Sequence, residues 1–183
     1  MSDTPSTPLR IAINGFGRIG RCVLRALHGR KAAGESLPQI VAINDLGAPD
    51  TLAHLLKYDT IHRTFGAEVK VDGDQLIVDG EAIALVREPD PKALPWKELG
   101  VDLVLECTGR FVSAEAASAH LEAGAKRVVI SAPAKGDVKT FVFGVNHADF
   151  DPAVDRVVSN GSCTTNCLAP IAKVLLDPFG IER

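Results

Sequence analysis

Apolar residues along this chain occur either as short continuous runs or at helical spacing. The runs RIAIN at Arg10–Asn14 and IVAIN at residues 40–44 predict two buried strands. Between them, residues 17–31 repeat apolar side chains every three or four positions, which predicts a helix. Strand, helix and strand therefore follow one another within about 35 residues, the size of a βαβ unit.

Residues 68–86 show a different pattern. Three short apolar runs are separated by the turn-like sequences VDGDQ and VDGEA, which predicts an antiparallel hairpin excursion. After a proline-rich connector, strands and helices alternate again, which favours a doubly wound, mostly parallel α/β sheet. The further predicted strands cover residues 101–106, 127–130, 140–144 and 156–159, and the further helices cover residues 52–58, 113–124 and about 162–176.

A glycine motif stands where the first strand meets the first helix. Gly15, Gly17 and Gly20 form G-x-G-x-x-G, and this position in a βαβ unit is typical of a Rossmann-type dinucleotide-binding turn. Gly15 would permit the tight turn, Gly17 would let the backbone approach a pyrophosphate, and Gly20 would let the helix pack on the strand. The amides of Arg18 and Ile19 open the helix and are candidate phosphate donors.

An acidic residue follows the second strand. Asp45 lies about 25 residues after Gly20, where a carboxylate can accept hydrogen bonds from ribose hydroxyls and repel a 2′-phosphate. That position predicts NAD rather than NADP, although an aspartate there can also serve as a turn former or helix cap. Thr108, Gly109 and Ser131 also follow predicted strands, and each is either a cofactor contact or a simple turn residue.

The sequence SNGSCTTNCLAP, residues 159–170, carries the candidate nucleophile. Cys163 stands at the start of a predicted helix, a place that favours the nucleophilic thiolate. Polar neighbours argue against simple burial of this thiol, whereas Cys167, one turn later, is interpreted as packing, and Cys22 and Cys107 as core. A dinucleotide turn and a cysteine at a helix start together suggest covalent oxidation of an aldehyde through a thioester.

Composition and charge argue against a nucleic-acid-binding protein and against a membrane-spanning one. A formal charge of −3 over 183 residues gives no footprint for nucleic acid, and no apolar run is long enough for a membrane helix. The four cysteines have neither the spacing of a disulfide framework nor that of a metal site, which favours a reducing, cytoplasmic setting without a bound metal. Residues 1–8 are polar and are expected to form a disordered leader.

The segments INGFGRIGR, VAIND, HLLKYD, AGAKRVVISAP and SNGSCTTNCLAP resemble the glyceraldehyde-3-phosphate dehydrogenase family, from Leu9 to the end of the chain. The resemblance implies that Cys163 forms the thioester and that Ser162 and Thr164 contact the substrate or inorganic phosphate. It also implies an adenine contact near Pro89. The implied cofactor contacts are Asn14, Gly15, Gly17, Arg18, Ile19, Asp45, Thr108, Gly109 and Ser131.

The same resemblance implies a domain organisation and an activity. Residues 9–161 would form the NAD-binding domain, and residues 162–183 would begin the catalytic domain. Members of the family are about twice as long, and the histidine that activates their cysteine lies in the further part. The implied reaction is the NAD-dependent oxidation of glyceraldehyde 3-phosphate, followed by phosphorolysis to 1,3-bisphosphoglycerate, in glycolysis, by a cytoplasmic homotetramer. This chain alone is expected to bind NAD but to be inactive.

Two alternatives stay open at this point. Erythrose-4-phosphate dehydrogenase is a close relative that shares much of the cysteine motif, so erythrose 4-phosphate is a competing substrate. The other alternative is a non-catalytic NAD-binding module that carries a reactive thiol.

Overall fold

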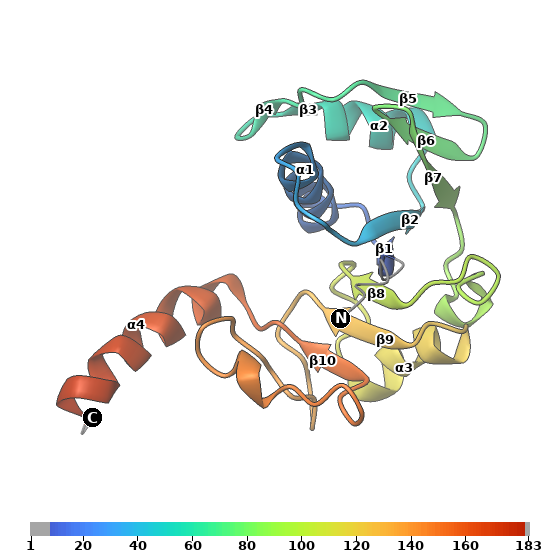
Figure 1. The fold of residues 1–183 in the computed structure, drawn as a ribbon. Coiled ribbons are helices and arrows are strands. Elements are labelled where there is room, and N and C mark those ends of the chain that lie inside the picture. The colour runs from blue at the N-terminus through green and yellow to red at the C-terminus, as the bar shows by residue number, and fades with distance from the viewer. Residues whose placement is uncertain (1–7, 182–183) are drawn as a thin grey trace, which may run out of the picture.

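A computed structural model describes residues 8–181, so the predicted leader lies, apart from Pro8, outside the described residues. Its main sheet has eight strands in the order β10-β9-β8-β1-β2-β7-β6-β5, and neighbours from β10 to β7 run parallel (Figure 1). The parallel strands are β1 (Arg10–Asn14), β2 (Gln39–Asn44), β7 (Glu81–Val86), β8 (Leu103–Glu106), β9 (Arg127–Ile130) and β10 (Val157–Ser159).

This strand order confirms the Rossmann-type prediction. The chain fills the sheet outward from β1 in one direction and then returns to add β8 on the other side of β1. Ligands of doubly wound sheets bind outside the carboxyl ends of the strands at such a switch point. A ligand is therefore expected just beyond the carboxyl ends of β1 and β8.

The strands are apolar because both faces of the sheet are covered. Ala12 and Val104 belong to a core that also holds Trp96, whereas Ile13 and Ile43 belong to a second core on the opposite face. Successive residues of a strand point to opposite faces, so one continuous apolar run supplies both cores. The helices that flank the sheet are α1 (Arg18–Ala32), α2 (Pro49–Lys57) and α3 (Ala114–Glu122). Short 3-10 turns lie at Pro91–Ala93 and His147–Asp149.

The antiparallel excursion is also confirmed. Strands β5 (Val69–Asp72) and β6 (Gln75–Val78) pair antiparallel, and β6 pairs antiparallel with β7. Strand β7 pairs parallel with β2 on its other side, so it closes the hairpins and completes the parallel sheet. The sequence pattern did not predict the small pair of β3 (Tyr58–Asp59) and β4 (Arg63–Thr64), whose two-residue strands are too short to show a period.

The strand predicted at residues 140–144 is wrong. Only Thr140 forms a bridge, to Ser159 at the edge of the sheet. The chain then turns, because Asn146 Oδ1 accepts from the Val142 amide at 2.8 Å and the Val145 amide donates to the Val142 carbonyl at 3.0 Å. The run TFVFG resembles a buried strand, but Phe143 is exposed.

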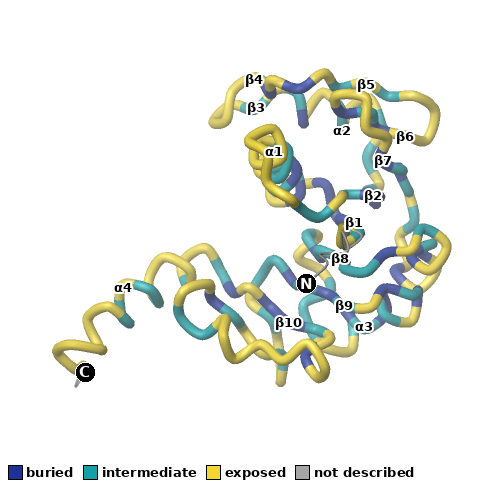
Figure 2. Tube along the Cα trace, in the orientation of Figure 1, coloured by how far each residue is buried: buried dark blue, intermediate teal, exposed yellow. Residues whose placement is uncertain are grey.

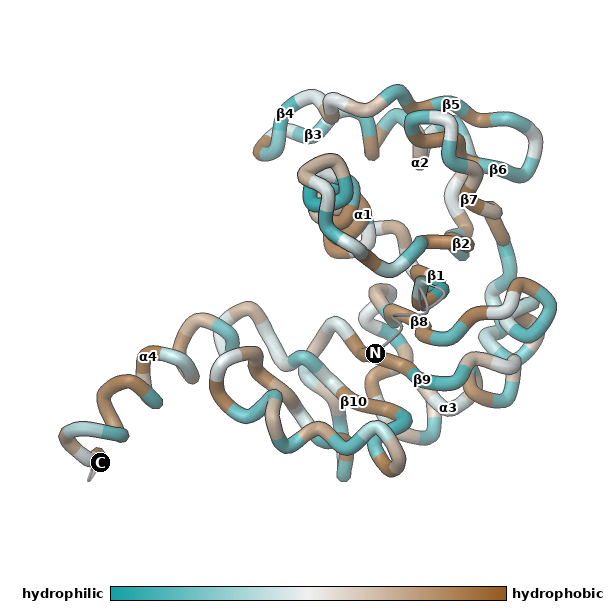
Figure 3. Tube along the Cα trace, viewed as in Figure 1, coloured by the Kyte–Doolittle hydropathy of each residue, from teal (hydrophilic) through white to brown (hydrophobic). Residues whose placement is uncertain are grey.

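Helix α4 (Cys163–Phe179) extends away from the sheet (Figure 1). It is mostly exposed along its length, although many of its residues are apolar (Figures 2 and 3). Its exposed large apolar side chains are Leu168, Ile171, Val174, Leu175, Leu176 and Phe179. Among the residues that the structure describes, no helix combines the length and apolar character that a membrane span requires.

Candidate functional site

The carboxyl ends of five parallel strands lie in one row. Asn14 at the end of β1 pairs in register with Asn44 of β2 and with Glu106 of β8. Glu106 is in register with Ile130 of β9, which is in register with Ser159 of β10. The residues that follow each strand therefore share one edge of the sheet, and most of the predicted site residues are among them.

Two glycines of the motif are required by the geometry of the turn. Gly15 has φ +91°, and a Cβ atom on it would lie 2.7 Å from the Thr108 backbone nitrogen. A Cβ atom on Gly20 would lie 2.5 Å from the Gly15 carbonyl oxygen. Gly15 thus brings the turn against the end of β8, and Gly20 brings α1 against the turn, as the sequence predicts.

Gly17 differs from the other two glycines, because a Cβ atom on it would meet no atom within 4 Å. It lies at the N-cap of α1 and offers no side chain to cap the helix. The first helical bond runs from the Arg21 amide to the Gly17 carbonyl, so the amides of Arg18 and Ile19 come before it. Bare backbone beside a helix N-terminus suits the approach of a pyrophosphate, so this part of the site fits a dinucleotide.

A cleft of about 290 Å³ opens at this turn, between the ends of β1, β2 and β8. Four predicted cofactor residues line it, namely Gly15, Gly17, Asp45 and Thr108. Its other lining residues are Asn44, Leu46, Glu88, Pro89, Cys107, Arg110 and Phe111. Pro89, near which the resemblance implies an adenine contact, therefore lines the same cleft as the glycine turn.

Asp45 links the turn between β1 and α1 to the loop that follows β2. One of its carboxylate oxygens accepts from the Phe16 amide at 2.7 Å, and the other accepts from the Gly47 amide at 2.8 Å. The contact with Gly47 is a local turn bond, so the turn-former interpretation of Asp45 holds as well. Each carboxylate oxygen has a second lone pair that a ribose hydroxyl can use.

The other predicted cofactor residues lie around the cleft rather than on its lining. Asn14 is buried beneath it, with its side-chain amide 2.6 Å from Glu106 Oε2. Ser131 follows β9, and its amide donates to the Glu106 carbonyl at 2.9 Å. Gly109 has φ +72° in the turn after β8. The Arg18 side chain turns to an ion pair with Asp59 at 3.0 Å, so only its backbone remains a candidate phosphate donor.

Cys163 is the first residue of α4, as predicted, and it is exposed. Ser162 is the N-cap, and its Oγ accepts from the Thr165 amide at 2.9 Å. The same Oγ lies 2.7 Å from both Thr164 Oγ1 and Thr165 Oγ1, so three hydroxyls gather at the start of the helix, on residues within two positions of Cys163 in the chain. The interpretation of Cys167 as packing is wrong, because this residue is exposed on the uncovered helix.

Cys107 is a residue that the sequence assigned to the core alone. It packs against the core on the α1 face and also lines the cleft. Burial raises the pKa of the Cys107 thiol to about 11, and a hydrogen bond with Ser131 offsets part of that effect. The thiol is therefore protonated at neutral pH and provides a packing surface rather than a nucleophile.

Glu88, Arg110 and Phe111 are lining residues that sequence reasoning missed. All three lie in loops just beyond strand ends, and no motif marks them. The position of a loop at the carboxyl edge was the one available signal, since loops at that edge surround the ligand in doubly wound sheets.

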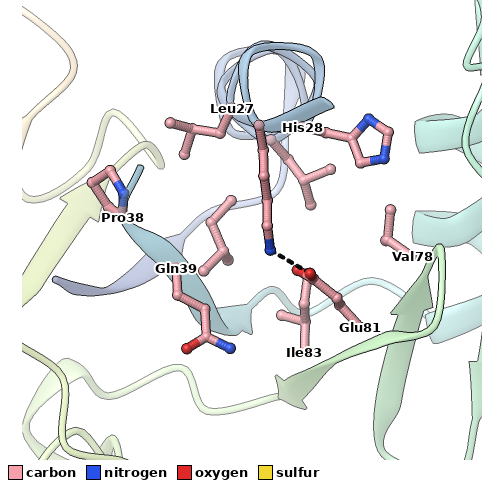
Figure 4. Close-up of a pocket in the computed structure, with 10 residues that line it drawn as sticks. Leu27, His28, Pro38, Gln39, Val78, Glu81 and Ile83 are labelled. Atoms are coloured by element: carbon pink, nitrogen blue, oxygen red, sulfur yellow. Dashed lines mark hydrogen bonds and ion pairs between the residues drawn. The ribbon is translucent and has the colours of Figure 1, made fainter. Parts of the chain in front are cut away.

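A second hollow, of about 50 Å³, lies between α1 and the β6–β7 hairpin (Figure 4). Its lining is mainly apolar, and Lys31 and His28 are already paired, with Glu81 and Asp79. The hollow is also far smaller than the cleft at the glycine turn, so it is a weaker candidate for a ligand site. Across residues 8–181, no group of three or more histidine, cysteine or acidic side chains is placed to hold a metal ion.

Comparison with known proteins gives a consistent result. A family model described as "Glyceraldehyde 3-phosphate dehydrogenase, NAD binding domain" matches residues 9–114, and the C-terminal domain model of the same family matches residues 162–183. Glyceraldehyde-3-phosphate dehydrogenases of Chlamydia pneumoniae, Kitasatospora aureofaciens and Geobacillus stearothermophilus are 56%, 59% and 54% identical to the chain. These alignments cover 95–96% of this chain and 51% of each relative.

The chain thus spans about half the length of the curated relatives it matches. The match to the NAD-binding model covers more than half of the 183 residues and includes the glycine turn, Asp45 and Thr108. The chain therefore belongs to the glyceraldehyde-3-phosphate dehydrogenase family and carries the NAD-binding domain of that family.

Proposed function

We propose that this chain holds NAD in the cleft and presents Cys163 as the nucleophile of a phosphorylating glyceraldehyde-3-phosphate dehydrogenase. The observation that carries the proposal is the shared edge of the sheet. The cleft lies at the end of β8, and Cys163 comes four residues after the end of β10, a strand that runs about 10 Å from β8 at ordinary strand spacing. One extended dinucleotide with a substrate beside it can reach both places.

The cofactor would be held by backbone at its centre and by side chains at its ends. The amides of Arg18 and Ile19 would receive the pyrophosphate, and Asp45 would accept from the adenosine ribose. Pro89 would lie against the adenine, and Thr108 would lie near the nicotinamide end of the cofactor. Asn14, Gly109 and Ser131 would support these contacts from the edge of the cleft. When bound, NAD supplies the two-electron oxidant for the reaction.

Cys163 would carry the substrate covalently. Its sulfur attacks the aldehyde carbon, which forms a C–S bond and moves the carbonyl electrons onto oxygen. Oxidation at that carbon restores the carbonyl and leaves a thioester. Inorganic phosphate then attacks the thioester and releases the Cys163 thiolate, which gives an acyl phosphate. The hydroxyls of Ser162 and Thr164, which lie 2.7 Å from each other, would donate to the substrate or to phosphate oxygens.

Glyceraldehyde 3-phosphate is the substrate that we propose. The named relatives at 54–59% identity all carry that substrate in their names, which favours it over erythrose 4-phosphate. Turnover also needs a base to deprotonate the thiol. None of the hydrogen bonds found within residues 8–181 reaches the Cys163 sulfur, so the chain is expected to bind NAD without efficient catalysis.

The proposal is tested by binding and by covalent trapping. Calorimetry with NAD and NADP should show a clear preference for NAD, since the carboxylate of Asp45 in the cleft would repel a 2′-phosphate. Incubation with glyceraldehyde 3-phosphate, NAD and no phosphate should leave only trace acylation on Cys163 by mass spectrometry, and none in Cys163→Ser. Failure to bind NAD would remove the proposed function, and rapid turnover would contradict the need for a further base.

We also propose that the full-length protein is a cytoplasmic homotetramer. The four cysteines are all free thiols, which suits a reducing compartment. The apolar exposed residues of α4 form a surface that suits coverage by further protein. Light scattering at several concentrations, on a protein that spans the full length of the curated relatives, tests the assembly, and a protein that stays monomeric would contradict it.

A further inference from the structure

A carboxylate is buried directly beneath the cofactor cleft. Glu106, at the end of β8, is 1% exposed. Its Oε1 accepts from the Thr108 backbone amide at 2.8 Å and from the Thr108 hydroxyl. Its Oε2 accepts from Asn14 Nδ2 at 2.6 Å and lies 3.0 Å from Nε2 of the fully buried His120. Four donors thus point at the four lone-pair positions of one carboxylate.

The hydrogen bonds also determine which ring nitrogen of His120 carries the proton. The Trp96 indole Nε1 donates to His120 Nδ1 at 3.1 Å. An indole can only donate, so Nδ1 must accept and the proton must be on Nε2, which then donates to Glu106. Trp96, His120 and Glu106 therefore form a directional chain that runs from the core beside α3 to the floor of the cleft.

The chain of bonds continues to both walls of the cleft. On one side, Thr108 Oγ1 accepts from the Arg110 amide at 3.0 Å, so the bonds of Glu106 shape the 108–110 turn. On the other side, Asn14 Oδ1 accepts from Asn44 Nδ2 at 2.7 Å. Asn44 in turn exchanges two bonds of 2.9 Å with the backbone of Glu88, next to Pro89.

We propose that Glu106 and His120 are positioning residues for the dinucleotide, which connect the Thr108 wall of the cleft to the Glu88 wall through one buried hydrogen-bonded network. Neither residue lines the cleft, so each acts through its neighbours rather than by touching the cofactor. The inference rests on the proposed NAD site. It goes beyond the residues that line the cleft, because it predicts that the bound dinucleotide is coupled to the core beside α3.

The only tryptophan of the chain provides a direct probe of this coupling. Its indole N–H gives a single resonance in a ¹⁵N-labelled sample, and the hydrogen bond to His120 should shift that resonance downfield. We expect saturation with NAD to move it, although Trp96 is fully buried and outside the cleft. An indole resonance that stays in place while the cleft fills would overturn the proposal.

Glu106→Gln gives the second test, with Val104→Ala as its matched control. A glutamine amide turns one acceptor oxygen into a donor, so either Thr108 or the Asn14 and His120 pair would face an NH₂ group. Val104 is also buried on β8, in the core that holds Trp96, but its apolar side chain makes no hydrogen bond, so its truncation loosens the same strand and core without removing a bond of the network. We expect Glu106→Gln to weaken NAD binding about tenfold and Val104→Ala to change it less than about twofold.

The outcomes separate this inference from the proposed function. If the unmodified chain does not bind NAD, both fail. If it binds NAD and Glu106→Gln binds equally well, the positioning role fails and the proposed function stands. Equal weakening in both variants also overturns the inference, because it would show that β8 acts only through general stability. Selective weakening in Glu106→Gln, with an altered indole response to NAD, supports it.

Discussion

The cofactor cleft and the cysteine helix lie on the same edge of one sheet, but they are held in different ways. The cleft depends on contacts between residues far apart in the chain, such as Gly15 against Thr108 and Glu106 against His120. The start of α4 depends on its own residues, since Ser162 caps the helix from within. The helix beyond it is largely exposed. The cleft is therefore organised by tertiary structure, and the thiol is presented by local structure.

The difference determines how each region should respond to change. A substitution in the cleft should spread through close backbone contacts and alter stability and binding together. A substitution at the cysteine should change chemistry while the sheet and the cleft remain intact. The predictions below test this division, beginning with the variant expected to have the largest effect.

Gly15→Ala should abolish NAD binding and destabilise the protein. The new Cβ atom would lie 2.7 Å from backbone at Thr108, at a φ of +91° that alanine rarely adopts. We expect a loss on the order of 3 kcal/mol of folding free energy and more than about 100-fold in NAD affinity. Thermal unfolding and calorimetry measure the two effects.

Gly17→Ala is the matched variant. Its Cβ atom would meet no protein atom within 4 Å, so the unfolding temperature should stay the same. NAD affinity should still fall about tenfold, because the added carbon occupies the approach to the backbone. If the two variants lost equal stability, Gly17 would also be required by contacts within the protein, and not only by the approach of the cofactor.

The thiols of the cleft and of α4 should also differ strongly in their reactivity toward an alkylating reagent. Cys107, with a pKa of about 11, should react with iodoacetamide at pH 7.5 about 100-fold more slowly than an unperturbed exposed thiol. Cys163 and Cys167 are exposed and should be modified first. Peptide mapping over time checks the order, and early labelling of Cys107 would show that the cleft opens more than the structure indicates.

Much of this fold could be predicted from periodicity and turn chemistry. The strands at Arg10–Asn14, Gln75–Val78 and Arg127–Ile130 appear where the apolar runs lie. The prediction failed at residues 140–144, where an apolar run is bound by the Asn146 side chain into a turn. A sequence pattern records which side chains are apolar, but it does not record a hydrogen bond that a side chain offers to backbone four residues earlier.

The candidate site could be predicted only as far as its motifs extend. The roles of Gly15 and Gly20 follow from the spacing and were confirmed by the close contacts around them. The buried connection from Glu106 to His120 could not be predicted, because it joins the end of a strand to a residue in the last turn of the following helix, 14 positions later. A lone glutamate in an apolar strand was its one visible sign, since a buried carboxylate needs partners.

The two helix caps offer a smaller test. Ser113 caps α3, which packs on the sheet, and Ser162 caps α4, which is exposed. Ser113→Ala should lower global stability by about 1 kcal/mol. Ser162→Ala should leave the unfolding temperature unchanged and speed amide hydrogen exchange at the start of α4 about fivefold. A drop in global stability from Ser162→Ala would show that α4 is coupled to the sheet.

The smallest effect on NAD binding is expected at the edge of the cofactor site, where the Arg18 side chain forms an ion pair with Asp59. Backbone bonds from His62 and Ile61 lower the pKa of Asp59 from 3.8 to about 2, and Arg18 contributes less. The folded state therefore favours the ionised carboxylate. Its stabilising effect is complete above the unfolded pKa and disappears as the pH falls from about 4 towards 2. The β3–β4 pair should accordingly keep its protection from amide exchange at pH 5 and lose it near pH 2.

Asp59→Asn should reproduce that loss of protection at pH 5, since it removes the charge without removing the side chain. NAD affinity should change less than about twofold, because Arg18 is proposed to serve the cofactor through its backbone amide, which the helix start holds in place. A large loss of NAD affinity in Asp59→Asn would mean that the Arg18 side chain takes part in binding. The β3–β4 pair would then belong to the cofactor site rather than to its surroundings.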